Sequence, residues 1–139
     1  MSFQWKERYN LGINEIDIQH KRLLEIGQKA YEIALLNDGY DHYDEIMNIL
    51  DELLEYTEYH FNYEENMLKN YGYKEIHNQE EEHYYYVYKI KSIASKEDID
   101  DNQKKTILEI LDFLSQWISN HIMLSDGKYA SFLKEKEVI

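Results

Sequence analysis

The chain has 139 residues, a formal net charge of −13, and neither proline nor cysteine. Its length suits one domain with a substantial core, and the absence of cysteine excludes disulfides, thiolate metal sites and cysteine nucleophiles. A surface this acidic repels phosphate backbones and anionic lipids, so we expect no nucleic-acid partner and no membrane partner.

The N-terminal segment, residues 1–15, lacks a helical repeat of apolar residues and contains Trp5, Tyr9 and Gly12. We predict that it forms an arm packed on the outside of the body. Residues 1–19 also lack the apolar stretch of a secretory signal, and no apolar run approaches the ~20 residues needed to span a bilayer. We therefore expect a cytoplasmic protein.

Two long helices are predicted in the first half of the chain, where proline is absent and glycine is rare. From Ile16 onward, apolar side chains recur with a 3.6-residue period until Asn37-Asp38-Gly39 breaks the helix. A second helix is predicted over residues 43–70 and ends before Gly72. The polar residues on the apolar faces of these helices are His20, His60 and Glu64.

Two further helices are predicted in the second half. The third begins between Lys74 and Ile76, and its apolar face includes Gln79 and His83. After a polar connection at residues 98–102, the fourth helix continues to His121. Ser125-Asp126-Gly127 is predicted to interrupt it, and a short terminal helix follows to Leu133.

Four helices of similar length with short links favour an antiparallel up-down-up-down four-helix bundle, which is an all-α fold. We predict a single domain over residues 1–139, in which residues 16–133 form the bundle and the terminal helix. In this topology the starts of the first and third helices share one end with the ends of the second and fourth. The polar residues that converge there are His20, His60, Glu64, Gln79, His83, His121 and Asp126.

A metal site explains this convergence better than coincidence does. A single buried histidine is more often a hydrogen-bonded core residue than a ligand, and Asp126 beside Gly127 could simply cap a helix. Glu64 on a core face, however, needs a cation or a strong hydrogen-bond network. His60 and Glu64, four residues apart, lie one above the other on their helix. Imidazole and carboxylate ligands gathered in a bundle core are what a pair of iron or manganese ions requires.

At these residues the sequence resembles the hemerythrin family, most closely its single-domain bacterial members, the bacteriohemerythrins. The resemblance covers nearly the whole chain. The segment FQWKERYNLGINEIDIQHKRLLEI resembles the family's N-terminal arm and first ligand helix. HFNYEENML is similar to the HxxxE segment, and HIMLSDGKYASFL is similar to the closing HxxxxD segment.

The resemblance implies a centre of two non-haem iron ions (Fe2+/Fe3+) joined by an oxo or hydroxo bridge. Carried onto this chain, His20 and His60 would hold the iron that has an open position for O2. His83 and His121 would hold the other iron. Glu64 and Asp126 would bridge the two.

The third segment departs from the family pattern, which is HxxxH. The apolar face that follows aligns its second histidine with His83, so that the first falls on Gln79. Three alternatives stay open besides a water: Gln79 ligates through its amide oxygen, His77 swings in, or Glu80, three residues before His83, binds instead.

The leading functional hypothesis is reversible binding of O2, for transport, storage or sensing. We keep three alternatives: an enzyme or scavenger that turns over peroxide or nitric oxide at a site altered by Gln79, an iron-storage protein, and a bundle that has lost its metal. Trp117 and Ile118 are candidates for the apolar wall of the O2 pocket, and Tyr84, Tyr85 and Tyr86 cluster nearby. We expect a small ligand such as O2, another diatomic or peroxide, and a monomer or small oligomer.

Overall fold

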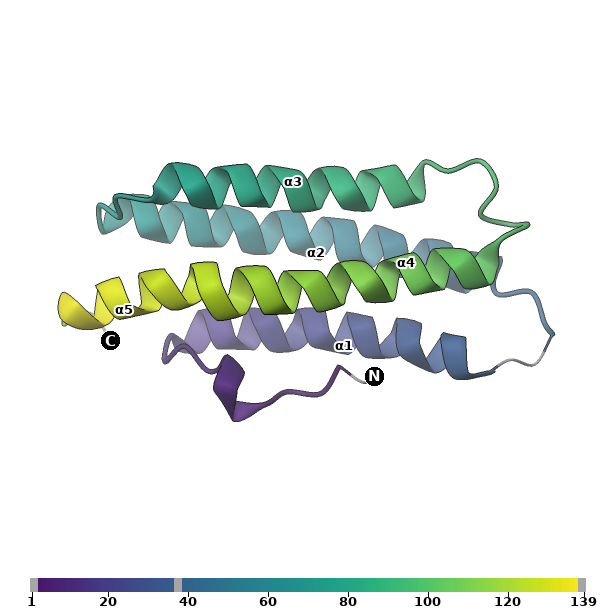
Figure 1. Cartoon of the computed structure of the whole chain (residues 1–139), viewed down its shortest axis with the longest axis horizontal. Helices are drawn as coiled ribbons and strands as arrows, with labels where there is room; N and C mark the ends of the chain where they lie inside the picture. The colour runs from purple at the N-terminus through teal and green to yellow at the C-terminus, as the bar shows by residue number, and fades with distance from the viewer. Residues whose placement is uncertain (1–2, 37–38, 138–139) are drawn as a thin grey trace.

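The computed structural model describes residues 3–36 and 39–137, apart from the side chain of Ser119. Two residues of the predicted first break, Asn37 and Asp38, lie outside these ranges. All regular structure in the described part is helical, and the four long helical stretches lie side by side and alternate in direction (Figure 1). The elements are η1 (Glu7–Tyr9), α1 (Asn14–Leu36), α2 (Tyr43–Asn70), α3 (Ile76–Ala94), α4 (Gln103–Gln116), η2 (Trp117–Asp126) and α5 (Gly127–Glu135). The prediction of an all-α four-helix bundle is confirmed.

The core consists of two apolar clusters. The main cluster includes Leu23 of α1 and Phe61 of α2, whereas a smaller one at the end of the bundle includes Ile16 and Leu68 from the same two helices. Between these positions lie His20 on α1 and Glu64 on α2, both fully buried. A layer of buried polar side chains therefore separates the two apolar clusters.

The predicted N-terminal arm runs alongside α1 (Figure 1) and contributes to the core itself. Phe3 and Tyr9 are buried in the main cluster. A methyl group added at Gly27 would lie 3.0 Å from Phe3 Cγ and from Leu114 Cδ1, so the absence of a side chain there permits the close approach. The backbone N–H of Phe3 donates to Gln28 Oε1 (3.0 Å).

The fourth helix differs from the prediction at Ser125-Asp126-Gly127. The helical path does not break there: α4 passes into the π-helix η2, and η2 passes directly into α5. Gly127 has helical angles (φ −59°, ψ −36°) and so continues the helix. The physical reason is a change in hydrogen-bond register from i→i+4 to i→i+5, which accommodates the polar segment without ending the helix.

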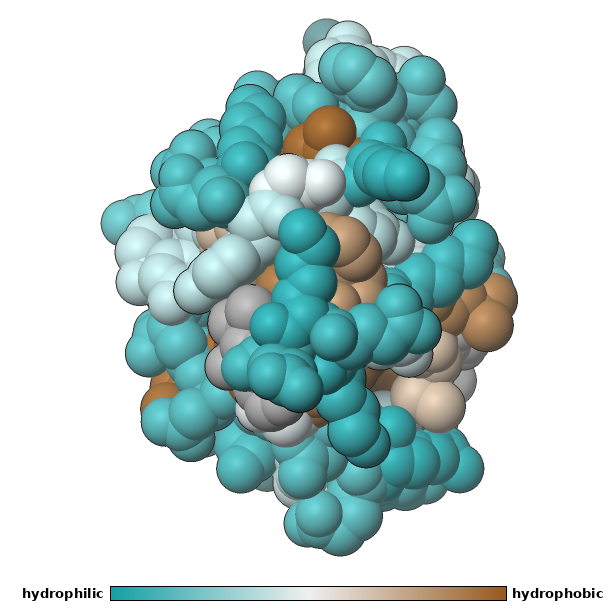
Figure 2. Space-filling view, turned by 90° about the vertical axis from the view of Figure 1, so that its left-hand side faces the viewer, coloured by the Kyte–Doolittle hydropathy of each residue, from teal (hydrophilic) through white to brown (hydrophobic). Residues whose placement is uncertain are grey.

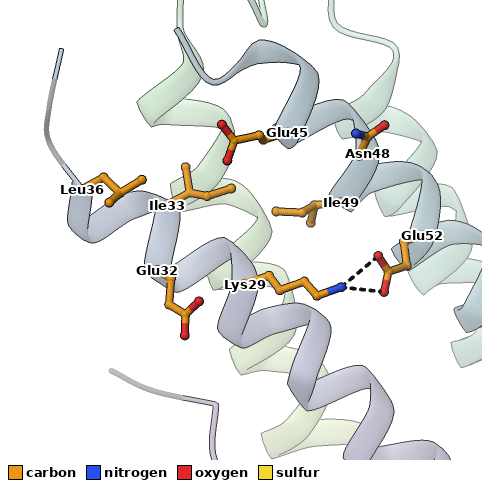
Figure 3. Close-up of a pocket in the computed structure, with 8 residues that line it drawn as sticks. All are labelled: Lys29, Glu32, Ile33, Leu36, Glu45, Asn48, Ile49 and Glu52. Atoms are coloured by element: carbon orange, nitrogen blue, oxygen red, sulfur yellow. Dashed lines mark hydrogen bonds and ion pairs between the residues drawn. The ribbon is translucent and has the colours of Figure 1, made fainter. Parts of the chain in front are cut away.

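The end of the bundle that carries the α2–α3 connection and α5 is mostly hydrophilic, with small hydrophobic areas between polar side chains (Figure 2). At the opposite end, a cavity of about 440 Å³ lies between α1 and α2, where Lys29 pairs with Glu52 at 3.3 Å (Figure 3). None of the candidate ligands lines that cavity. No helix in the described part of the chain combines the length and apolar character needed to cross a membrane.

Candidate metal centre

The structure brings together all six candidate ligands, which come from four helical stretches. Each is buried, with at most 3% of its surface exposed. The residues are His20 on α1, His60 and Glu64 on α2, His83 on α3, and His121 and Asp126 on η2. Antiparallel packing brings the six candidate ligands together, because the early positions of α1 and α3 lie beside the late positions of α2 and η2.

The π-helix places His121 and Asp126 on the same side. On an α-helix, residues five apart differ by about 140° in direction. In the i→i+5 register they lie nearly above one another. His121 Nε2 accordingly lies 3.1 Å from Asp126 Oδ1. Asp126 is fully buried, has helical angles (φ −71°, ψ −31°) and makes no side-chain capping hydrogen bond, so it does not act as a helix cap.

The ligand atoms form two groups that share one carboxylate. The first comprises His20, His60, Glu64 and Asp126, and the second comprises Glu64, His83 and His121; within each group the atoms lie within 4.8 Å of one another. Glu64 Oε1 lies 3.0 Å from His60 Nε2 and 3.4 Å from His83 Nε2. Asp126 likewise contacts a histidine of each group: its Oδ2 lies 3.3 Å from His20 Nε2, and its Oδ1 lies 3.1 Å from His121 Nε2. Two carboxylates thus stand between two pairs of imidazoles.

Three of the histidines are oriented by partners at their outer nitrogens. His60 Nδ1 lies 2.6 Å from Gln19 Oε1, and the amide nitrogen of Gln19 in turn donates to Glu15. His83 Nδ1 lies 2.8 Å from Glu65 Oε2. His121 Nδ1 lies 2.7 Å from Glu82 Oε2. Because each acceptor requires a proton on Nδ1, a neutral imidazole presents its Nε2 lone pair to the interior.

The inward atoms fit a cation. The buried atoms without a hydrogen-bond partner include His20 Nε2, His60 Nε2, Glu64 Oε1 and Asp126 Oδ2, one from each residue of the first group. In the second group, His83 Nε2 and His121 Nε2 face each other at 3.2 Å. Lone pairs so placed repel one another unless a proton or a metal ion lies between them. The donor set of imidazoles and carboxylates suits iron.

Without metal, protons partly take the place of a cation. Burial lowers the pKa of His121, but Asp126, Glu64 and Glu82 outweigh this effect and hold it well above its ordinary value. Burial likewise opposes the rise in the pKa of His83 that Glu64 and Glu65 produce. For Glu64, burial raises the pKa, yet the surrounding imidazoles hold it well below its ordinary value. Burial dominates only at His60, whose pKa is lowered.

Tyr129 on α5 holds the shared carboxylate from the other side. Its hydroxyl donates to Glu64 Oε2 (2.5 Å), and the side chain is fully buried. Burial together with Asp126 and Glu64 keeps the pKa of Tyr129 well above its ordinary value. The phenol therefore stays protonated and remains a donor.

Gln79 faces this centre, and the two alternative residues do not. Gln79 is 2% exposed, its Nε2 donates to Asp126 Oδ1 (3.3 Å), and its Oε1 has no hydrogen-bond partner. The side chain of His77 is 89% exposed and lies near Glu80, which also pairs with Lys69 on the surface. The position is thus filled by a neutral amide on the His121 side of the centre.

Aromatic and aliphatic side chains enclose the polar layer. The Trp117 ring stands edge-on to His20 (5.6 Å between centroids), and Ile118 packs against the main cluster. Of the three clustered tyrosines, Tyr86 is buried with its ring 5.4 Å from His121, whereas Tyr84 and Tyr85 are exposed.

Sequence reasoning missed the residues that support the ligands. Gln19, Glu65 and Glu82 reach the histidines across gaps between elements, and no periodicity signals such contacts. Among the acids at the start of α3, the sequence points to Glu80 as a possible ligand, whereas Glu82 is the acid that contacts a candidate ligand, His121. Tyr129 had a usable signal, because it lies three residues after Asp126 and hence on the same helix face.

Comparisons with known proteins relate this chain to one family. The family model for the hemerythrin HHE cation binding domain matches residues 11–133. A bacteriohemerythrin of Clostridium acetobutylicum is 45% identical over 128 residues, which cover 91% of this chain and 98% of the relative. A bacteriohemerythrin of Pseudomonas paraeruginosa is 30% identical, covering 94% of this chain and 80% of the relative. A hemerythrin-like protein of Naegleria gruberi is 28% identical, covering 94% and 93%.

Proposed function

This chain belongs to the hemerythrin family of cation-binding proteins, and from that premise we propose that its buried centre holds two non-haem iron ions and binds O2 reversibly. The observation that carries the proposal is the set of four buried ligand atoms that converge without hydrogen-bond partners. These atoms face one another in pairs, His60 Nε2 with Glu64 Oε1 at 3.0 Å and His20 Nε2 with Asp126 Oδ2 at 3.3 Å, and a cation between them would satisfy all four.

In the proposed arrangement His20 and His60 would hold one iron, and His83 and His121 would hold the other. Glu64 and Asp126 would be shared by the two ions, and an oxo or hydroxo group would supply the remaining ligand. The iron pair would supply reversible electron transfer to O2.

The surrounding protein contributes orientation and exclusion of water. Gln19, Glu65 and Glu82 fix three imidazole rings through their Nδ1 atoms. Tyr129 fixes Glu64 through its hydroxyl. The Trp117 ring lies beside His20 and would keep water from a small ligand there, and Ile118 packs against the main cluster.

Gln79 favours a second candidate function, turnover of peroxide or nitric oxide. An amide is a weaker ligand than an imidazole, so the His83–His121 ion would have a position that a small ligand can take. Such a centre would consume its ligand and would not release it intact.

Location in the cytoplasm, a single-domain organisation and the oligomeric state stay predictions from the sequence.

The visible absorption spectrum of the reduced, iron-loaded protein distinguishes the two functions. We expect a charge-transfer band when O2 is admitted and its disappearance when O2 is removed under vacuum. A band that decays irreversibly, or an oxidised spectrum that forms at once and does not reverse, would contradict reversible binding and favour turnover.

A further inference from the structure

The side of the centre occupied by Gln79 adjoins a surface cavity of about 150 Å³. Its outer residues, including Glu75 and Glu81, are exposed, whereas Gln79 at its inner side is almost completely buried. We call this hollow, which is also lined by Glu82 and Ser125, the Gln79 cavity.

Only one layer of side chains separates the Gln79 cavity from the ligands. Gln79 lines the cavity and also donates to Asp126 Oδ1 (3.3 Å). Glu82 lines the cavity and also accepts from His121 Nδ1, while Ser125 Oγ donates to Glu82 Oε1 (2.8 Å). The Oε1 atom of Gln79 is buried within this layer without a partner, so an oxygen ligand is available between the cavity and the centre.

The charge of the Gln79 cavity selects cations. Glu75, Glu81 and Glu82 line it, against the single basic side chain Lys128. A cleft lined by one sign of charge concentrates ions of the opposite sign and repels anions.

A second cavity near the centre, of about 300 Å³, offers a poorer path. Its inner side is the His83 ring itself, which stacks on Phe61 with 3.9 Å between centroids and is held at Nδ1 by Glu65. An ion that entered there would have to move the His83 ring away from both Phe61 and Glu65. At Gln79 the barrier is one amide held by one 3.3 Å hydrogen bond.

We propose that the Gln79 cavity is the port through which a divalent metal cation reaches the His83–His121 position. Glu75 and Glu81 attract the ion, and the oxygens of Glu82 and Gln79 receive it as it sheds water. This proposal rests on the proposed function, since it requires that the centre bind metal.

The test is the rate at which the metal-free full chain takes up Co2+, followed by stopped-flow visible absorption at low ionic strength. The variant E75Q/E81Q removes two charges from the Gln79 cavity. The matched control E58Q/E80Q removes two charges from the second cavity, and its Glu80 is the sequence neighbour of Glu81. We expect E75Q/E81Q to slow uptake about tenfold and the control to stay within about twofold. The difference should shrink as salt screens exposed charges.

Equal slowing of both variants, slowing of the control alone, or no slowing in either would overturn the port while leaving metal binding intact. The final amount of bound Co2+ separates this failure from that of the proposed function. Wild-type protein that bound no metal at any time would overturn both.

Discussion

At the residue scale, Glu64 links the two halves of the candidate centre. One carboxylate oxygen faces His60 and His83, and the other accepts the Tyr129 hydroxyl. A buried carboxylate with this many partners is strongly constrained in position, and removal of any partner leaves charge or lone pairs uncompensated. Changes around Glu64 should therefore alter metal binding as well as the stability of the metal-free fold.

Replacing Gln79 with histidine should tighten metal binding, because it supplies an imidazole where the chain has a weak amide ligand. We expect an increase in affinity of roughly tenfold or more, since even outer partners of ligands change affinity by ~10–100-fold. Competition with a chelator measures the change. His77→Gln serves as the control, because His77 is exposed and away from the centre. Equal effects of the two substitutions, or weaker binding by Gln79→His, would contradict the placement of Gln79.

Tyr129→Phe removes one hydroxyl and leaves the aromatic ring in place. Glu64 Oε2 then loses its donor, so we expect metal affinity to fall about tenfold. Tyr73→Phe is the matched control, because its hydroxyl donates to Glu75 at the surface (3.2 Å) and contacts no ligand. Unchanged metal affinity in Tyr129→Phe would show that the hydroxyl does not position the carboxylate.

At the element scale, η2 determines whether two ligands five residues apart can serve one centre. A regular α-helix would turn Asp126 away from His121, whereas the π-helical register keeps both side chains inward. Passing into α5 without a break also brings Tyr129 to Glu64. This irregular element is thus part of the site.

Much of this arrangement could be predicted from the sequence, because periodic burial is what the sequence encodes most directly. His20, His60, Glu64 and His83 lie on apolar helix faces, and the antiparallel topology then brings them together. The π-helix could not be predicted, because Ser125-Asp126-Gly127 resembles a helix stop and nothing local specifies an i→i+5 register. The partners Gln19, Glu65 and Glu82 depend on side-chain directions between helices, which periodicity does not report.

The N-terminal arm provides a test of packing at the same scale. Phe3 fills the space above Gly27, so Phe3→Ala should leave a cavity and lower the free energy of unfolding by about 3 kcal/mol. We expect the low end of the usual range because the arm can shift to close part of the cavity. Urea denaturation measures the loss, with the exposed Gln4→Ala as control. A loss below about 0.5 kcal/mol, as surface substitutions give, would show that the arm does not contribute to the core.

At the scale of the whole molecule, the polar layer between the two apolar clusters couples stability to pH and to metal. Above the ordinary histidine pKa of 6.5, the unfolded chain has lost protons that His121 and His83 keep in the folded state. The free energy of unfolding of the metal-free protein should therefore decrease as pH rises above 6.5. Below 6.5, His60 acts in the opposite direction, because its lowered pKa makes the folded chain bind fewer protons than the unfolded chain.

The stabilisation that metal provides should change in the opposite direction above pH 6.5. Metal must displace protons from the imidazoles, so its stabilising effect grows as those protons become easier to remove. We expect the metal-free Tm to fall between about pH 6.5 and 8.5, while the gain in Tm on adding Fe2+ anaerobically increases. Thermal unfolding followed by circular dichroism checks both trends, and a metal-free Tm that rose over this interval would contradict the assignment of protons to His121 and His83.

Two metal positions that share Glu64 are the central feature proposed for this chain. The direct test is the ratio of iron to protein after anaerobic loading and removal of free iron by gel filtration, for wild-type chain and for Glu64→Gln. We predict two iron ions per wild-type chain, one for each ligand group, and loss of both in Glu64→Gln because the shared carboxylate serves each position. A wild-type ratio of one or zero, or a variant that retained both ions, would contradict the shared centre.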